Sequence, residues 1–321
     1  MRILVTGGTG NVGRLVVERL ARVDVEVRVL SRRPGGGPAG VEMVRGDLAD
    51  PDSLLPALRS VDRMYLFPCP RTAAEVVRLA ERAGVRRIVT LSSGAVTTGY
   101  DTDFHLPVER AVEASGTEWT HLRPAEFMLN DLWLWGPTIR AERAVYEPFP
   151  ERTGRPVHER DVAEVAVAAL LGAGHSGRAY TIYGPAVLSR REQVRAIAAA
   201  IGEEIRFEAV TPARARELYL AQGGFAAASA NFLTGFQPYS AGSPDSPPAS
   251  DSAPGSDPAP GSDPAPGSDP APAAPAPGPG SAAGQGMPTA RDVTGRPART
   301  FAEWARDHAM DFAAESDRFG S

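Results

Sequence analysis

The chain has 321 residues, a net charge of −5, and acidic and basic residues interspersed along its length. All 34 basic residues are arginine, which excludes any mechanism that needs a lysine. The sequence has no basic stripe of the kind that binds nucleic acid, and no apolar run long enough to span a membrane. We therefore expect the partner to be a small molecule, with no nucleic acid and no membrane.

The cysteine content and the first residues of the chain bear on the cellular compartment of the protein. Cys69 is the only cysteine, so it cannot form an internal disulfide, and a single thiol fits a reducing compartment. Met1 and Arg2 lead directly into the apolar run 3–5, which leaves no room for a signal peptide. We expect a cytoplasmic protein.

A glycine-rich loop follows the strand expected at 3–5 and opens a helix expected at 11–21. Its sequence is Thr6-Gly7-Gly8-Thr9-Gly10-Asn11-Val12-Gly13. Glycines permit the tight turn, the close approach of backbone to a pyrophosphate and the close packing of helix on strand, and a helix N-terminus attracts phosphate. The pattern predicts a dinucleotide site rather than an unliganded turn. We expect cofactor contacts from Thr6, Gly7, Gly10, Asn11, Val12 and Gly13.

The end of the second strand, expected at 25–30, bears on which dinucleotide binds. NAD sites usually have an acidic residue there, which binds the ribose 2′-hydroxyl. This chain has Ser31, Arg32 and Arg33 instead. Two guanidinium groups and a hydroxyl suit a 2′-phosphate, which favours NADP(H) over NAD(H). The alternative is that both arginines are solvated surface charges.

Gly46, Asp47 and Leu48 follow the third expected strand, at 41–44. The Asp47 carboxylate there is a candidate acceptor for the adenine amino group, with Leu48 against the ring. The alternative is that Asp47 caps a turn or a helix. The sequence leaves the two interpretations open.

Strands and helices continue to alternate as far as residue 122. Apolar runs predict strands at 64–67, 87–91 and 119–122. Apolar residues spaced three and four apart predict helices at 51–58, 72–83 and 107–114. This order predicts an α/β fold with a Rossmann-type, doubly wound parallel sheet.

After residue 127 the regular alternation of predicted strands and helices ends. We expect helices at 162–171, 190–201 and 212–221, and strands at 180–183 and 205–210. Part of this region is expected to form a small C-terminal α/β lobe over the cofactor cleft. The Rossmann domain with this lobe is expected to span 1–239, the lobe mainly from about 125–239.

Residues 240–287 differ in composition from the rest. They are rich in Pro, Ala, Gly, Ser and Asp and contain the repeat Ala-Pro-Gly-Ser-Asp-Pro three times between 253 and 270. Such a segment lacks the apolar surface to offset the entropy of ordering it, so we expect a disordered linker. Residues 288–321 follow, with an amphipathic helix expected at 301–312 that docks back on the main domain.

Motifs at 6–13, 30–33, 46–48, 91–94 and 122–127 together resemble the NmrA-like, NAD(P)H-binding branch of the atypical short-chain dehydrogenase/reductase family. The resemblance covers residues 1–235 and more loosely 294–301. It implies that Phe67 and Pro68 line the nicotinamide ribose, that Ser92 and Ser93 face the nicotinamide, and that Pro124 flanks its other side. An alternative for the two serines is an ordinary loop with turn hydroxyls.

The substrate is expected on the lobe side of the nicotinamide. Candidate contacts are Phe127, Asn130 and Trp133, which follow the sixth expected strand. Core packing of the lobe is an alternative role for the aromatic residues. The scattered histidines predict no metal site.

The family's usual proton-transfer pair is missing. Orthodox members use a tyrosine and a lysine four residues later, whereas this chain has His105 and Glu109 at the corresponding positions. Two functions therefore remain. In the first, the protein is an NADPH-dependent oxidoreductase that transfers hydride to a quinone or an enone, with His105 or water as proton donor. In the second, it binds NADP(H) without turnover and signals redox state to a protein partner. His105 is as well explained by a structural role as by an acid role.

Overall fold

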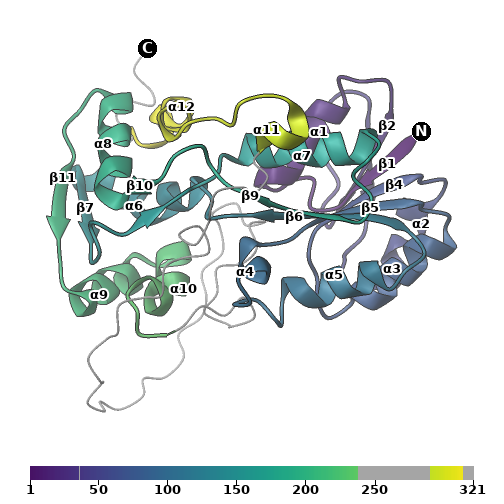
Figure 1. Ribbon diagram of the computed structural model, residues 1–321, viewed down its shortest axis with the longest axis horizontal. Helices are drawn as coiled ribbons and strands as arrows, with labels where there is room; N and C mark the ends of the chain where they lie inside the picture. Colours follow the sequence, from purple (N-terminus) through teal and green to yellow (C-terminus); the bar gives the residue numbers. More distant parts are fainter. Residues whose placement is uncertain (36, 238–289, 314–321) are drawn as a thin grey trace.

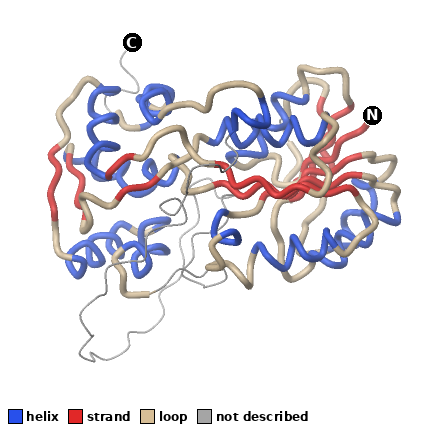
Figure 2. The backbone as a smooth tube through the Cα atoms, in the orientation of Figure 1, coloured by secondary structure: helices blue, strands red, loops and turns tan. Residues whose placement is uncertain are grey.

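A seven-stranded parallel sheet forms the larger part of the molecule (Figures 1 and 2). The computed structural model describes residues 1–35, 37–237 and 290–313, so the linker expected at 240–287 lies outside the described residues. The strand order β3-β2-β1-β4-β5-β6-β9 confirms the predicted Rossmann-type sheet. The strands are β1 (Arg2–Val5), β2 (Glu26–Ser31), β3 (Val41–Arg45), β4 (Arg63–Leu66), β5 (Arg87–Leu91), β6 (Glu118–Pro124) and β9 (Arg178–Ile182).

Helices cover both faces of this sheet, as doubly wound folds require (Figure 1). On one face lie α1 (Asn11–Leu20) and α7 (Glu159–Leu171), which pack against each other. On the other lie η1 (Pro51–Leu54), α2 (Leu55–Leu58), α3 (Ala73–Arg82) and α5 (His105–Glu113). The strands are apolar on both sides for this reason: Ile3 and Val5 face one helical layer, and Leu4 faces the other.

A smaller α/β lobe begins where β6 ends. Its helices are α6 (Leu129–Glu142), α8 (Arg190–Ile201), α9 (Pro212–Gln222) and α10 (Gly224–Leu233). Its strands are β7 (Ala144–Glu147) paired in parallel with β11 (Arg206–Ala209), and β8 (Thr153–Gly154) paired with β10 (Leu188–Ser189). Because α6 directly follows the carboxyl end of β6, the lobe lies at the carboxyl edge of the sheet (Figure 1).

Not all of the region after residue 125 belongs to the lobe. The helix expected at 162–171 is α7, which packs on α1, and the strand expected at 180–183 is β9, which extends the main sheet beside β6. The chain therefore leaves the sheet after β6, returns for α7 and β9, and leaves again for α8. Two backbone bonds tie the crossing segment to the edge of the sheet: Val157 N–H donates to the Glu126 carbonyl at 2.8 Å, and Met128 N–H donates to the Val157 carbonyl at 3.0 Å.

Residues 290–313, here called the C-terminal strap, cross from the sheet to the lobe (Figure 1). The strap contains α11 (Ala290–Thr294), which packs on α7, and α12 (Phe301–Asp307), which packs on α8, followed by the short helix η2 (Ala309–Asp311). Ala290 belongs to the core between α1, α7 and the sheet. Phe301, Trp304 and Phe312 belong to the core of the lobe, where all three are buried.

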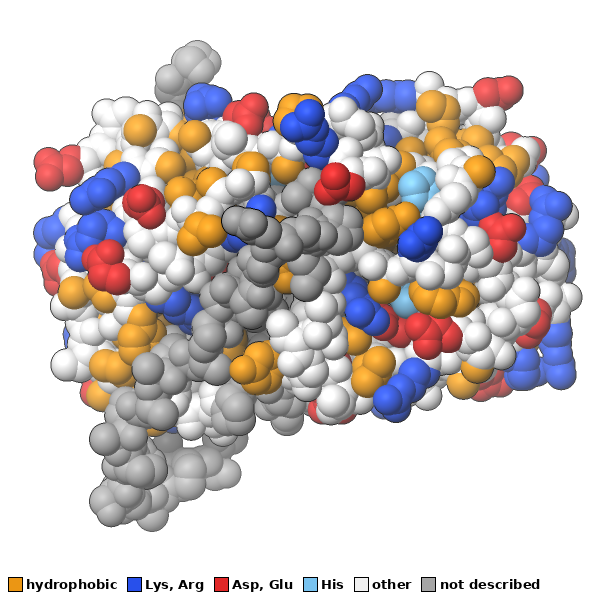
Figure 3. Space-filling view, viewed as in Figure 1, with side chains coloured by type: hydrophobic (Ala, Val, Ile, Leu, Met, Phe, Trp, Pro, Cys, Tyr) orange, Lys and Arg blue, Asp and Glu red, His pale blue; other side chains and the backbone are white. Residues whose placement is uncertain are grey.

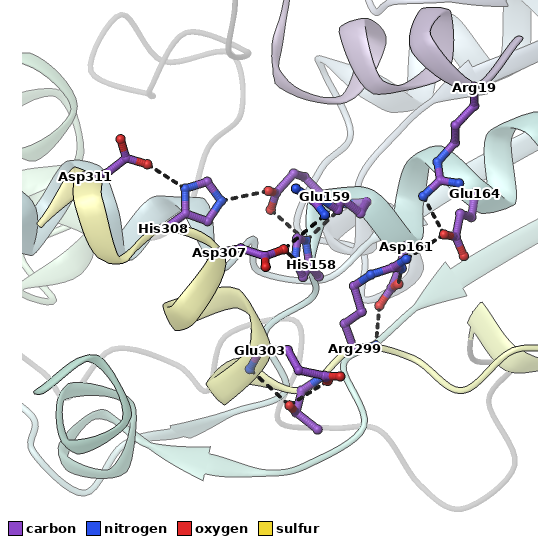
Figure 4. Close-up of polar contacts among 12 residues, drawn as sticks. Arg19, His158, Glu159, Asp161, Glu164, Arg299, Glu303, Asp307, His308 and Asp311 are labelled. Atoms are coloured by element: carbon purple, nitrogen blue, oxygen red, sulfur yellow. Dashed lines mark hydrogen bonds and ion pairs between the residues drawn. The ribbon is translucent and has the colours of Figure 1, made fainter. Parts of the chain in front are cut away.

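Charged groups hold the strap to the first turns of α7 (Figure 4). Arg299 donates from its backbone N–H to Asp161 Oδ2 at 2.8 Å and from its guanidinium to Asp161 and to Glu164 Oε1, the latter at 2.7 Å. His308 Nε2 lies 3.0 Å from Glu159 Oε1, and His308 Nδ1 lies 2.8 Å from Asp311 Oδ2. Each end of the strap therefore combines apolar burial with ion pairs.

Acidic and basic side chains alternate over the face of the molecule shown in Figure 3. Within residues 1–35, 37–237 and 290–313, no helix combines the length and the apolar character needed to cross a bilayer.

Candidate functional site

The glycine loop between β1 and α1 has the geometry that its sequence predicts. Gly7 has a φ of +62°, in the left-handed region that favours glycine. A Cβ atom at Gly7 would lie 2.9 Å from the ring of Phe67, and one at Gly13 would lie 2.0 Å from the Gly7 carbonyl oxygen. Neither position therefore has room for a side chain, because Phe67 fills the space at Gly7 and the loop backbone fills it at Gly13.

The loop ends at a helix N-terminus that no side chain caps. The N-cap residue of α1 is Gly10, and it makes no side-chain hydrogen bond to the first turn. The first N–H groups of a helix carry partial positive charge and need an acceptor, which a pyrophosphate supplies. Asn11, Val12 and Gly13 form this first turn, so the residues present fit a dinucleotide.

Thr6 ties the loop to β4. Its side chain is completely buried, donates to the Tyr65 carbonyl at 3.0 Å and accepts from the Phe67 N–H at 2.7 Å. This fixes Phe67 and the buried Pro68 at the carboxyl end of β4, beside Gly7. Phe67 and Pro68 therefore lie at the carboxyl edge of the sheet next to the glycine loop, whereas the hydroxyl of Thr6 is already engaged within the protein.

The turn after β2 presents two arginines to solvent. Ser31 Oγ accepts from the Arg33 N–H at 3.2 Å, so the serine hydroxyl shapes the turn. Arg32 and Arg33 are exposed, and within the described parts of the chain neither guanidinium has a hydrogen bond or an ion pair. Both cations are available to a phosphate group.

Asp47 adopts a turn-capping geometry. Its Oδ1 accepts from the Ala49 N–H at 2.9 Å, and its own N–H donates to Ser53 Oγ at 2.9 Å. One carboxylate oxygen is thus used within the turn, which is the arrangement of the capping alternative. Leu48 is half-buried against the core below α2.

The two serines after β5 differ in role. Ser93 is the N-cap of α4 (Gly94–Thr97), accepting from the Ala95 N–H at 3.2 Å. Ser92 is buried and donates to Glu109 Oε1 at 2.5 Å. Pro124 lies beside them, because a Cβ at Gly94 would be 3.1 Å from the Pro124 carbonyl oxygen. The structure therefore brings the carboxyl ends of β5 and β6 together as expected.

Glu109 is the partner of Arg123 on β6. The guanidinium donates from Nε to Glu109 Oε1 at 2.9 Å and from Nη2 to Glu109 Oε2 at 2.6 Å. Burial opposes ionisation of Glu109, but the hydrogen bonds from Arg123 and Ser92 outweigh it and lower its pKa. An ionised, buried carboxylate thus occupies the position at which orthodox family members have lysine.

His105, the first residue of α5, is oriented by a buried acid. Its Nδ1 lies 2.5 Å from Asp101 Oδ2, and Asp101 Oδ1 accepts the backbone N–H groups of Phe104 and His105. Burial opposes ionisation of Asp101, but the hydrogen bond and charge of His105 and these N–H groups lower its pKa. Since Nδ1 is engaged with Asp101, Nε2 is the nitrogen left for an external partner.

The candidate substrate residues lie at the start of the lobe. Phe127 forms an isolated bridge with Val157, and Trp133 packs against Phe225 of α10 with ring centroids 5.4 Å apart. Asn130 is half-buried near the start of α6. Phe127 and Trp133 are also half-buried, and both adjoin the core of the lobe.

One group of metal-ligand types occurs in the described residues: Glu109, Glu113 and His121, whose ligand atoms lie within 4.8 Å of one another. The sequence did not indicate it, because the three residues come from α5 and β6. Arg123 occupies both oxygens of Glu109, and His121 Nδ1 lies 2.6 Å from Thr90 Oγ1. A guanidinium at that position opposes a cation, so the group does not carry a metal assignment.

Sequence reasoning missed Asp101 and Arg123. Both had a signal: Asp101 precedes His105 by four residues at the start of a helix, and Arg123 interrupts the apolar strand β6. A charged side chain within a sheet covered on both faces needs a buried partner.

Comparisons with known proteins agree with this geometry. Residues 7–172 match a family model described as NAD(P)H-binding. The chain is 36% identical to the (4-alkanoyl-5-oxo-2,5-dihydrofuran-3-yl)methyl phosphate reductase of Streptomyces griseus, over 98% of this chain and 100% of that protein. It is 31% identical to the NAD(P)H azoreductase of Xenophilus azovorans, over 97% and 99% of the two chains.

Two solved structures share the fold. The triphenylmethane reductase of Citrobacter sp., complexed with NADP(H), has a TM-score of 0.62 at 20% identity, covering 74% of this chain and 88% of that one. The NADPH-dependent quinone oxidoreductase of Escherichia coli, complexed with NADPH, also has a TM-score of 0.62 at 20% identity, covering 72% and 87%.

Proposed function

Because the chain belongs to the NAD(P)H-binding, NmrA-like branch of the atypical short-chain dehydrogenase/reductase family, we propose that it reduces an electron-poor organic acceptor with NADPH. A reduced nicotinamide supplies a hydride. The acceptor is a quinone or an activated alkene such as an enone. Two curated relatives that match nearly the whole chain are named as reductases, which supports reduction as the class of reaction.

The observation that carries this proposal is the pair formed by His105 and Asp101. Hydride addition to a quinone or an enone leaves negative charge on oxygen, which must then take up a proton. His105 supplies that proton from Nε2, and Asp101 orients the ring through its contact with Nδ1. Arginine is a poor proton donor at neutral pH because its pKa is above 12.

The preference for NADPH rests on Arg32 and Arg33. Two exposed guanidinium groups at the end of β2, with no acid on that turn, suit a 2′-phosphate. The glycine loop and the uncapped first turn of α1 serve the pyrophosphate, and Phe67, Pro68 and Pro124 serve the nicotinamide end.

The acceptor class has support from one relative. The substrate for which the Streptomyces griseus reductase is named contains a 5-oxo-2,5-dihydrofuran ring, which is an alkene conjugated with a carbonyl group. That chemistry matches the activated alkene expected from a site without the tyrosine and lysine pair. The side chains that we expect to border the acceptor are Phe127, Asn130 and Trp133.

The test is NADPH consumption with a panel of quinones, enones and aldehydes, alongside the dissociation constants of NADPH and NADH. We expect turnover with quinones or enones and none with simple aldehydes, together with tighter binding of NADPH. Tight binding of NADPH without turnover on any acceptor would overturn the enzyme proposal. That result would favour a non-catalytic NADP(H) sensor acting on a protein partner.

A further inference from the structure

Arg152 begins the segment that crosses back from the lobe to the sheet. This segment runs through β8 and reaches Val157, which pairs with Phe127 at the carboxyl edge of the sheet. Gly154, two residues after Arg152, lies against Glu126, since its Cβ position is 3.2 Å from Glu126 Oε2. Arg152 is therefore close in sequence and in space to the loop that follows Pro124.

The guanidinium of Arg152 has no hydrogen bond or ion pair with any residue that the structure describes. It lies over the ring of Phe232 in α10, 5.9 Å from the ring centroid. Burial and the neighbouring charge of Arg190 lower its pKa, so the cation is in an unfavourable environment. The groups that act on it electrostatically are Arg190, Glu126, Glu147 and Tyr219.

The carboxylates around Arg152 and its neighbour Arg190 compensate the charges of the two guanidinium groups poorly. Glu126 is committed to Arg190, whose Nη2 donates to Glu126 Oε1 at 2.6 Å. Burial raises the pKa of Asp131 well above its usual value and also raises the pKa of Glu147, so neither readily carries a full negative charge. The two guanidinium groups face one firmly ionised carboxylate, and a desolvated cation without a partner is costly.

A guanidinium in this state is suited to an incoming anion. Its planar donors match the oxygens of a phosphate or a carboxylate in a bidentate geometry, and a charge-assisted bond gains strength in a site shielded from water. By comparison, the Arg190 guanidinium makes three side-chain hydrogen bonds, to Glu126, to Asp131 at 3.2 Å and to Gln193 at 3.0 Å. Arg152 is the member of the pair that retains its donors.

We propose that Arg152 binds an anionic oxygen group of the substrate, a phosphate ester or a carboxylate, while the reducible part of the substrate lies toward Pro124 and Phe127. The inference rests on the proposed function and narrows its substrate class to acidic acceptors. It also assigns recognition of the substrate to the lobe and the chemistry to the carboxyl edge of the sheet.

The experiment compares two acceptors that differ only in charge: a naphthoquinone with a carboxymethyl chain and its methyl ester. In the full-length protein we expect the acid to have the lower KM. Arg152→Gln should raise the KM of the acid about tenfold to a hundredfold, as expected for the loss of a charged hydrogen bond, and should change the KM of the ester less than about twofold. Arg152→Lys keeps the positive charge but lacks the planar guanidinium donors. It should recover part of the difference in KM between the acid and the ester.

Arg191→Gln is the matched control. Arg191 is the neighbour of Arg190, pairs with the exposed Glu151 at 3.2 Å and lies over Phe207, so it loses the same charge outside the site. It should leave the ratio of the two KM values unchanged. Circular dichroism and thermal unfolding establish that each variant is folded.

Binding separates this inference from the proposed function. Calorimetric titration of the NADP⁺ complex with the carboxymethyl quinone should show tight binding that Arg152→Gln weakens, whether or not the protein turns over. If no acceptor in the panel of quinones and enones is reduced, the proposed function fails, while this binding result still decides the role of Arg152. Equal affinity of wild type and Arg152→Gln for the acid, or equal KM changes for acid and ester, would overturn the assignment.

Discussion

The Cβ position of Gly13 lies 2.0 Å from the carbonyl oxygen of Gly7, so the first turn of α1 and the start of the glycine loop touch through their backbones. Any side chain at position 13 must push the loop away from the helix. Gly13→Ala should therefore weaken NADPH binding at least about tenfold and destabilise the fold by about 1–3 kcal/mol, the usual cost of overpacking. Fluorescence titration and denaturant unfolding measure the two effects.

The control for this substitution is Gly35→Ala. Gly35 has open space around its Cβ position, and its backbone is outside the left-handed region. The same change there should leave stability within about 0.5 kcal/mol of wild type. Equal NADPH affinity in Gly13→Ala and wild type would argue against a pyrophosphate in this loop.

Arg32→Glu should separate the two cofactors. The substitution removes a guanidinium and puts a carboxylate at the end of β2, which repels a 2′-phosphate and can accept from a 2′-hydroxyl. We expect the affinity for NADPH to fall about tenfold to a hundredfold, while that for NADH changes little. Arg22→Glu makes the same charge change at an exposed position beyond the far end of α1 and is the control. Equal losses for both cofactors would contradict the assignment.

Asp101→Asn tests how His105 works. The amide keeps the size of the side chain but removes the carboxylate that contacts His105 Nδ1, so the ring loses the group that orients it. We expect kcat to fall about tenfold to a hundredfold, as general acid catalysis contributes roughly a hundredfold or more. The dissociation constant of NADPH should stay the same.

His105→Gln is the partner variant in this test. It should lower kcat by a similar factor and leave the dissociation constant of NADPH unchanged. Unchanged kcat in both variants would mean that His105 serves the start of α5 only.

Glu109→Lys restores the lysine of orthodox family members and should nonetheless fail to restore their chemistry. It would place a second cation against Arg123, which now donates two hydrogen bonds to Glu109. Breaking a buried ion pair typically costs about 3–5 kcal/mol, so we expect a marked fall in thermal stability and no alcohol dehydrogenase activity. Glu109→Gln, which loses the charge without adding another, should be less destabilised. A stable, active Glu109→Lys protein would show that this ion pair is dispensable.

The strap should make stability depend on pH through His308. Burial opposes its charged form, but hydrogen bonds to Glu159 and Asp311 outweigh burial and raise its pKa above 6.5. The contribution is therefore full below about pH 6.5, the value in the unfolded chain, and is lost as pH rises through the higher folded pKa. We expect the Tm of wild type to fall on the alkaline side of pH 6.5, and that of His308→Gln to be flatter there.

Glu159 contributes to the stability of the fold in the acidic pH range. Burial opposes its ionisation, but hydrogen bonds from His158 and His308 lower its pKa to about 2, so its contribution is present above the unfolded value of 4.5 and is lost as pH falls toward 2. His175→Gln is the control for the His308 prediction. Burial lowers the pKa of His175, so any change in stability from its titration lies below pH 6.5. If His175→Gln changes the fall of Tm above pH 6.5 more than His308→Gln does, the strap is not the source of that fall.

The sheet was predictable because its signals are local. Each strand from β1 to β6 is a short apolar run, and the glycine loop stands between strand and helix where a dinucleotide fold needs it. The helix expected at 190–201 is α8 residue for residue, since Ser189 and Glu192 form a capping box that marks its start.

The lobe was less predictable for physical reasons. α6 is apolar on several sides and includes Pro137, so it lacks the single apolar stripe of a surface helix. α10 consists largely of alanine and other small residues that give little periodic signal. The contacts in the site were unpredictable for a related reason. Ser92 and Arg123 both contact Glu109, and these three residues come from separate elements that only the fold brings together.

The order in which the chain is synthesised determines when the strap can cover the core of the lobe. When residue 237 has left the ribosome, the sheet, the lobe and every proposed cofactor contact exist as polypeptide, yet Trp304 and Phe312, both wholly buried in the mature protein, do not. Domains generally fold as units while they emerge. We therefore expect the apolar face of the lobe that Trp304 and Phe312 cover to remain exposed to chaperones and other nascent chains until the strap has been synthesised.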